Sequence, residues 1–307
     1  PKLAQVGDEV PDGDWTHRPG HPLPLALFDA VRVDYSLKRL QHYTGTNWRA
    51  VQPWILLTNY HRYVDQFVKW GLEQLAKDSP YSVLYLPGGG KITRGMARAE
   101  AESIIASSQW HRFQMPAYHL SRGDGHGGVT LVNIGVGPSN AKTATDHIAV
   151  LRPHAWLMVG HCAGLRNSQS LGDFVLAHAY LREDHVLDDD LPVWVPIPAL
   201  AEIQIALEDA VEEVTQLEGY ELKRIMRTGT VATIDNRNWE LRDQSGPVQR
   251  LSQSRAIALD MESATIAANG FRFRVPYGTL LCVSDKPLHG ELKLPGMASD
   301  FYKTQVA

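Results

Sequence analysis

The chain has 307 residues, of which 44% are hydrophobic and 21% are charged, with a formal net charge of -4 and a pI near 6.4. Such a composition is typical of a globular protein with a sizeable core, and it gives no reason to expect binding to a nucleic-acid polymer or a membrane. No apolar run approaches the ~20 residues of a membrane span, and no signal-peptide pattern opens the chain. The two cysteines, Cys162 and Cys282, lie in apolar contexts and are interpreted as reduced core thiols of a cytoplasmic protein.

The N-terminal part of the chain is interpreted as an extension, residues 1–76, ahead of a catalytic domain, residues 77–307. Residues 1 to about 50 are rich in Pro and Gly and are expected to be irregular. The basic, aromatic patch at 38–49 is either a solvated connection or an anion-binding or subunit-contact surface. A strand is predicted at 54–58, and apolar residues at helical spacing predict a helix at 62–75.

A glycine-rich turn follows the next predicted strand, residues 81–86, and precedes a predicted helix at 98–107. Backbone N–H groups at such a turn, together with a helix N-terminus, form an anion site, and nearby cations add charge-assisted hydrogen bonds. The alternative is a plain tight turn. The candidate phosphate-binding residues are Gly88, Gly89, Gly90, Lys91 and Arg94.

Two more glycine-rich segments follow predicted strands. The strand at 129–134 leads into residues 135–140 and a helix at 141–151, and the strand at 156–159 leads into a turn at 160–164. Glycines at these positions allow a backbone to approach a ligand closely, although both segments are also compatible with simple βα turns. The candidate binding residues here are Gly137, Ser139, Gly160 and His161.

Beyond these segments, a strand is predicted at 173–179, a solvated acidic loop at 183–190, an amphipathic helix at 199–217 and a strand at 228–234. The polar loop at 235–239 ends in Trp239, an aromatic side chain suited to stacking on a base.

Two carboxylates follow the last two predicted strands, residues 256–259 and 277–283. A helix at 264–269, ended by Gly270, joins these strands. In a βαβ unit both strands end at the same edge of a parallel sheet, where ligands bind, so Glu262 and Asp285 are expected to lie together. Such a pair suits a site where one acid grips a polar substrate and the other handles a proton. Alternatively, Glu262 caps the helix and Asp285 caps a turn before Pro287.

These motifs resemble, in order, those of the nucleoside phosphorylase and nucleoside hydrolase superfamily. The family shows PGDPxR, GxGxxS, GSxGG, a strand ending in ME and a strand ending in SD. This chain shows PGGGKITR, GVGPSN, GHCAG, DMES and SDKP over about residues 80–290. The resemblance implies an α/β fold with a nucleoside-phosphorylase-like mixed sheet flanked by helices, preceded by an N-terminal extension or small α+β domain.

Within the superfamily, the chain is most similar to the members that hydrolyse the N-glycosidic bond of AMP to adenine and ribose 5-phosphate. Met158 stands where bacterial phosphorylases carry an arginine, and His161 where they carry a serine. Those family residues hold the attacking inorganic phosphate, so their replacement favours water as the nucleophile. The runner-up is a purine nucleoside phosphorylase or another purine nucleosidase. A different class is a nucleotide-binding regulator without turnover.

The resemblance also implies roles for individual residues. Glu262 would bind the ribose hydroxyls, Met261 would pack against the sugar, and Asp285 would be the general acid toward N7 of adenine. Ser284 and Lys286 would orient or tune Asp285, and Trp239 or its neighbours would line the base pocket. His61 and Arg62 would reach a neighbouring subunit's site. No metal or catalytic cofactor is expected, and the family resemblance implies a homohexamer that MgATP activates, although the sequence locates no ATP site.

Overall fold

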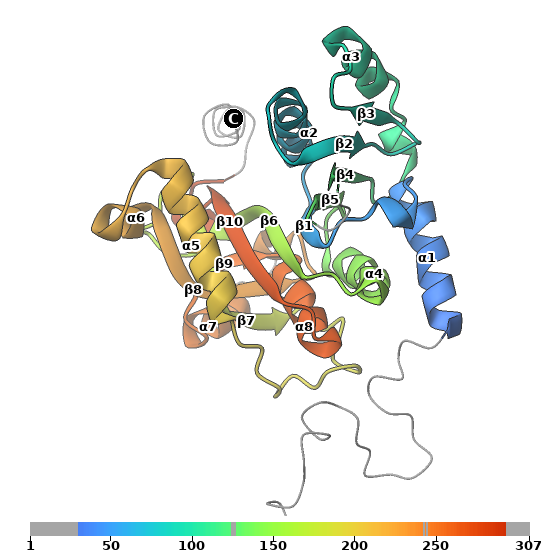
Figure 1. Ribbon diagram of the computed structural model, residues 1–307. Helices are drawn as coiled ribbons and strands as arrows, with labels where there is room; N and C mark the ends of the chain where they lie inside the picture. The colour runs from blue at the N-terminus through green and yellow to red at the C-terminus, as the bar shows by residue number, and fades with distance from the viewer. Residues whose placement is uncertain (1–29, 124–126, 242, 244, 293–307) are drawn as a thin grey trace, which may run out of the picture.

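The computed structural model describes residues 30–123, 127–241, 243 and 245–292, and these form a mixed α/β fold (Figure 1). Its strands are β1 Trp54–Thr58, β2 Tyr81–Tyr85, β3 Lys91–Thr93, β4 Ala117–Arg122, β5 Val129–Asn133, β6 Ala155–Gly164, β7 Phe174–Glu183, β8 Met226–Ile234, β9 Ala256–Asp260 and β10 Tyr277–Asp285. Its helices are α1 Ala30–Thr44, α2 His61–Ala76, α3 Arg98–Ser107, α4 Pro138–Ile148, α5 Ala201–Thr215, α6 Gly219–Ile225, α7 Ser245–Gln253 and α8 Ser263–Phe273. The predicted class, a mixed sheet flanked by helices, is confirmed.

One ten-stranded sheet organises the molecule, in the order β10-β7-β8-β9-β6-β1-β5-β4-β2-β3. Because β6 also pairs with β10, the strands β6, β9, β8, β7 and β10 close into a ring. The other five strands extend from β6 as an open wing that ends in the β2–β3 hairpin (Figure 1). In the ring, β6 runs parallel to β10, whereas β7, β8 and β9 run in the opposite direction.

Part of the sheet is formed by residues before 77, the position at which the catalytic domain was predicted to begin. Strand β1 lies between β5 and β6 and is parallel to both, with Trp54 paired to Val129 on one side and Ala155 on the other. Residues 30–44, expected to be irregular, form α1, which packs on α4 through a 3.1 Å contact between Ser36 Oγ and His147 Nδ1. The predicted boundary therefore cuts through the sheet.

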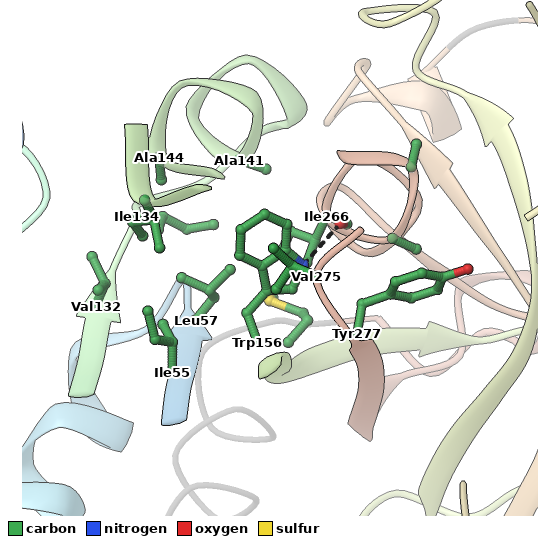
Figure 2. Close-up of a cluster of buried hydrophobic side chains, with 14 of the residues drawn as sticks. Ile55, Leu57, Val132, Ile134, Ala141, Ala144, Trp156, Ile266, Val275 and Tyr277 are labelled. Carbon is green, nitrogen blue, oxygen red and sulfur yellow. Dashed lines mark hydrogen bonds between the residues drawn. The ribbon is translucent and has the colours of Figure 1, made fainter. Parts of the chain in front are cut away.

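The main core lies where β1, β5 and β6 meet α4 and α8, with Trp156 of β6 at its centre (Figure 2). The indole of Trp156 is fully buried, and its N–H donates to the carbonyl of Ile266 in α8 at 3.2 Å. This hydrogen bond satisfies the one polar atom of a large apolar side chain, which is the usual condition for burying tryptophan. Ile55 and Leu57 join this core from β1, the wing strand that pairs with β6 (Figure 2).

Helix α8 is longer than predicted, because Gly270 does not end it. The helix continues to Phe273, and the following residue, Arg274, takes the left-handed conformation that closes it, with φ 55°. Gly270 instead permits close packing, since a Cβ there would lie 2.4 Å from the ring of Tyr277 on β10. Almost all of α8 is buried, which explains its alanine-rich sequence.

Helices α2 and α5 cover other parts of the sheet. Val64, Phe67 and Leu75 of α2 pack against the wing, and Leu207 and Val211 of α5 pack against the ring. The spacing of the three α2 residues is the helical periodicity that the sequence displayed. None of the helices in the described part of the chain has the length and apolar character needed to cross a membrane.

Candidate active site

A cavity of about 530 Å³ lies where the ends of β1, β6, β9 and β10 come together. Both carboxylates selected from the sequence, Glu262 and Asp285, line it, as do the predicted site residues Met261, Ser284 and His161. One cavity therefore brings together five of the predicted site residues from three strand ends.

The strand arrangement that brings the two acids together differs from the one predicted. Strands β9 and β10 were expected to be parallel, but β9 is antiparallel to β6, which runs parallel to β10. Ala163 of β6 pairs with Leu259 of β9 on one side and with Asp285 of β10 on the other. The closed ring, in which β6 lies between the two strands, thus brings the acids to the same place.

Glu262 is fully buried and held by two donors from distant segments. Its Oε1 accepts the backbone N–H of Gly137 at 2.6 Å, and its Oε2 accepts Nδ2 of Asn59 at 2.8 Å. Gly137 has φ 114°, a conformation that favours glycine, and it precedes α4, so the carboxylate faces a helix N-terminus. Burial and the nearby Asp260 raise the pKa of Glu262 to about 8, against the opposite effect of its two donors.

Asp260, not Glu262, caps helix α8. The Asp260 carboxylate accepts the backbone N–H of Ser263 at 2.9 Å and the hydroxyl of Thr233 at 2.5 Å. The N–H of Ala264 is satisfied in turn by Thr233 Oγ1 at 2.9 Å. Burial raises the pKa of Asp260 to about 6, although its donors act in the opposite direction. Glu262 makes no side-chain cap hydrogen bond, so the capping alternative for this residue is wrong and its carboxylate is left to the cavity.

Asp285 ends β10 at the wall of the cavity. The hydroxyl of Ser284 donates to Asp285 Oδ1 at 2.5 Å, which orients the carboxylate as predicted. Lys286, also expected to orient Asp285, does something else. Its buried ammonium donates to the carbonyl of Gln169 at 2.8 Å and pairs with Glu291 at 2.7 Å, so it anchors the chain after β10.

The segment 160–164 is strand and not the predicted glycine turn, because β6 continues to Gly164. His161 is buried, lines the cavity and packs against the ring of Tyr60 at 4.5 Å. Met158 is fully buried in the core, so this position offers nothing to an anion. A Cβ on Gly160 would lie 2.8 Å from Met158 Cε and 3.2 Å from Asn59 Oδ1, which explains the glycine.

Ser139 and Trp239, both predicted to bind substrate, do not line this cavity. Ser139 is exposed in the first turn of α4, and its carbonyl accepts the hydroxyl of Thr143. Trp239 is buried in a small apolar cluster and lines a neighbouring cavity of about 250 Å³. Its neighbours Arg237 and Asn238 line the cavity that holds the two acids.

The glycine-rich segment with its cations lies on the far edge of the sheet. Gly88, Gly89 and Gly90 connect β2 to β3 in a hairpin, so the predicted order of strand, turn and helix is wrong. Arg94 donates to the carbonyl of Tyr81, and Lys91 lies 5.8 Å above the ring of Tyr85. None of these residues lines the cavity, and in the sheet the strands β5 and β4 lie between the hairpin and β1, whose end borders the cavity.

His61 and Arg62, which were predicted to reach a neighbouring subunit's site, are the first two residues of α2. His61 stacks on Trp110 with ring centroids 3.9 Å apart, and Arg62 is exposed. Neither lines the cavity, but Asn59 and Tyr60, which lie between β1 and α2, do.

Sequence reasoning did not single out several residues of the cavity wall, among them Asn59, Tyr60 and Arg237. A signal existed for the first two, since they directly follow a strand that proved to be central. Arg237 belongs to the polar loop in which Trp239 was singled out and its neighbours were named only collectively as lining of the base pocket. Across the residues that the structure describes, no group of three or more His, Cys, Asp or Glu side chains is arranged to hold a metal ion.

Comparisons with known proteins identify the family of the chain. Residues 92–302 match the family model described as the phosphorylase superfamily. The AMP nucleosidases of Escherichia coli strain K12 and of E. coli O157:H7 are each 60% identical over 308 residues, and the match covers 100% of this chain. The chain spans 62% of the length of these curated relatives.

Solved structures share the fold. AMP nucleosidase from Bacteroides thetaiotaomicron VPI-5482 has a TM-score of 0.61 at 25% identity, covering 82% of this chain and 90% of that one. Purine nucleoside phosphorylase from Toxoplasma gondii, solved with immucillin-H, has a TM-score of 0.59 at 16% identity, covering 86% of this chain and 92% of that one. The second likeness concerns the fold alone.

Proposed function

The chain belongs to the phosphorylase superfamily, and from that membership we propose that it hydrolyses the N-glycosidic bond of AMP to adenine and ribose 5-phosphate. The observation that carries the proposal is the cavity in which the buried Glu262 and the Asp285 carboxylate lie together. The 60% identity to AMP nucleosidases of E. coli supports AMP as the substrate.

The two acids have complementary tasks in this reaction. As the bond between C1′ and N9 breaks, the ribosyl group becomes oxocarbenium-like and the purine gains negative charge. Asp285, oriented by Ser284, delivers a proton to N7 so that adenine leaves as a neutral base. Glu262 accepts hydrogen bonds from the ribose 2′- and 3′-hydroxyls and fixes the sugar during bond cleavage. Water adds to C1′ and releases a proton to solvent, which gives ribose 5-phosphate, and Asp285 takes up a proton from solvent for the next turnover.

Water is favoured over inorganic phosphate as the nucleophile by the composition of β6. At the position where bacterial phosphorylases carry an arginine, Met158 is fully buried in the apolar core. His161 is packed against Tyr60 at the cavity wall. Neither arrangement supplies the fixed positive charge that an attacking phosphate dianion needs.

Binding of the 5′-phosphate of AMP needs a cation, and Arg237 is the residue best placed to supply it. It is the one Lys or Arg side chain that lines the cavity within the described part of the chain, and it is exposed to an approaching ligand. A guanidinium binds phosphate oxygens in a bidentate manner, which suits recognition of a phosphate monoester. Lys91 and Arg94, the cations that the sequence suggested for this task, do not line the cavity within this chain.

The proposal is tested by measuring adenine release from AMP and from adenosine, each with and without inorganic phosphate. Cleavage of AMP that is independent of phosphate and yields ribose 5-phosphate is the expected result. Preference for adenosine with an absolute need for phosphate would contradict the proposal and favour a purine nucleoside phosphorylase. Tight AMP binding without any product would instead indicate a nucleotide sensor.

Assembly, regulation and location are further proposals that rest on the family resemblance: a homohexamer, activation by MgATP and a cytoplasmic location. Exposed apolar side chains on α5 and α6 support self-association, since Ile205, Val214 and Tyr220 are 62%, 81% and 79% exposed. Light scattering after size-exclusion chromatography measures the assembly, and assays with and without MgATP measure the activation.

A further inference from the structure

Asn59 makes the one side-chain hydrogen bond to Glu262 among the described residues. Its Nδ2 donates to Glu262 Oε2 at 2.8 Å, and the second oxygen of the carboxylate accepts the N–H of Gly137. The contact joins the end of β1 to the turn after β9 across 203 positions of sequence, so it is a product of the tertiary fold. Both side chains line the cavity.

The amide of Asn59 is placed for this contact by its surroundings. The absence of a side chain at Gly160 leaves room for it, because a Cβ there would lie 3.2 Å from Asn59 Oδ1. That Oδ1 is buried and has no hydrogen-bond partner in the part of the chain that the structure describes. A buried acceptor without a partner needs an explanation, and at a cavity wall a ligand hydroxyl or a bound water supplies one.

Resting on the hydrolysis of AMP proposed above, we propose that Asn59 is a positioning residue whose Nδ2 holds the Glu262 carboxylate in the orientation that receives the ribose hydroxyls. Glu262 has to act as an acceptor for these hydroxyls, and a carboxylate acts as an acceptor with both oxygens only when it is ionised. Asn59 favours that state because hydrogen bonding to the charged form stabilises it.

Other groups around the cavity act on the same carboxylate. Those that titrate or carry charge are Asp260 from β9, His161 and Cys162 from β6, Asp285 from β10, Tyr60 after β1, and Arg237 and Glu240 after β8. Asp260 opposes the ionisation of Glu262, and burial opposes it more strongly. The backbone of Gly137, the side chain of Asn59 and the backbone of Met261 work in the other direction, and of these only the Asn59 donor is removable by a side-chain substitution.

The test compares kcat/KM for AMP and for 2′-deoxy-AMP, across pH, in the wild-type chain and in Asn59→Leu and Asn59→Asp. Thr58→Val is the matched control, since Thr58 is the preceding residue, is fully buried and does not line the cavity. Asn59→Leu is expected to lower kcat/KM for AMP by about 10- to 100-fold, the loss of one hydrogen bond to a charged group. The loss for 2′-deoxy-AMP should be much smaller, so the preference for the ribose substrate shrinks.

The pH profile gives a readout that a purely structural role would not change. Without the Nδ2 donor the pKa of Glu262 rises further, so the acidic limb of kcat/KM moves to higher pH. Asn59→Asp preserves the side-chain volume but replaces the donor with a second carboxylate, so it is expected to shift the acidic limb further than Asn59→Leu, whereas Thr58→Val should show no shift. Melting temperatures identify variants that fold poorly, and Asn59→Asp keeps the test valid if Asn59→Leu is one of them.

The outcomes separate this inference from the function on which it rests. If the wild-type chain cleaves AMP but folded Asn59→Asp keeps the wild-type discrimination and pH profile, the role of Asn59 is overturned and the function stands. Equal losses for AMP and 2′-deoxy-AMP with an unmoved acidic limb also overturn it. A wild-type chain that leaves AMP intact contradicts the proposed function itself.

Discussion

Asp260 and Glu262 lie two positions apart in one buried turn, and their carboxylates bind different partners. Asp260 accepts the N–H of Ser263 and caps α8, whereas Glu262 points to Asn59 and Gly137 at the cavity. Because Asp260 and Thr233 satisfy the first N–H groups of the helix, the residue at the N-cap position is released from capping. This arrangement buries two carboxylates close together. Burial and the nearby Asp260 disfavour the ionised form of Glu262, and the resulting loss of folding stability can be measured.

Glu262→Gln is expected to stabilise the fold at high pH. The folded-state pKa of Glu262 is raised from 4.5 to about 8, so its contribution to stability is fully present below pH 4.5 and is lost as pH rises through 8. Glutamine avoids the buried charge, and we expect a gain of about 1–4 kcal/mol at pH 9 and almost none near pH 4.5. Thermal unfolding at the two pH values measures it.

The exposed Glu221, which pairs with Arg224 on α6, supplies the control. Glu221→Gln should change the melting temperature little at either pH. An equal shift for Glu262→Gln at both pH values would contradict the assignment of a raised pKa to Glu262.

Arg237→Gln is expected to weaken binding of AMP selectively. Loss of a guanidinium from a phosphate costs about 1.5–3 kcal/mol, or about 10- to 150-fold in KM for AMP, while kcat changes little. Weak cleavage of adenosine, which lacks the phosphate, should be unaffected. The matched control is Arg250→Gln, whose side chain lines the neighbouring cavity and pairs with Glu183 at 2.7 Å. A similar KM increase in Lys91→Gln would return the phosphate site to the hairpin.

Gly270→Ala is expected to destabilise the protein although alanine favours helices. The new Cβ would lie 2.4 Å from the Tyr277 ring, whose hydroxyl is tied to the carbonyl of Pro198 at 2.6 Å. Overpacking of this kind costs about 1–3 kcal/mol. Gly246→Ala in α7, where the nearest atom is the end of the Arg250 side chain at 3.5 Å, should be neutral or slightly stabilising. Denaturant unfolding of both variants decides the point.

Local patterns predicted most of the elements and both acids. The strands at 54–58 and 81–86 and the α2 helix follow from periodicity and β propensity, and the structure has them at β1, β2 and α2. Glu262 and Asp285 were found because each follows a strand. The reason given for their meeting was nonetheless wrong, since a helical crossover was taken to imply parallel neighbours. Only the closure of the ring through β6 brings the antiparallel β9 beside the same residue as β10.

The differences between the predicted site residues and the residues that line the cavity share one cause, which is that local sequence does not reveal strand order. Gly88–Gly90 and Asn59 both follow strands, but β2 lies near the edge of the sheet and β1 lies beside β6. A glycine-rich turn with cations was therefore preferred over the less conspicuous Asn59-Tyr60 pair. Likewise, GHCAG has the composition of a turn, yet its residues lie in β6 because Gly160 and Gly164 allow close packing there.

The most direct test of the account is the rate of adenine release from AMP by Asp285→Asn in the absence of inorganic phosphate. Asparagine keeps the shape of the side chain but has no acidic proton, so we expect kcat to fall by about 10²–10⁴-fold with the melting temperature preserved. Asp209→Asn, an exposed position on α5, should retain wild-type activity. A folded Asp285→Asn variant that cleaves AMP within a few-fold of the wild-type rate would contradict the role of Asp285 as the acid and, with it, the mechanism proposed for this cavity.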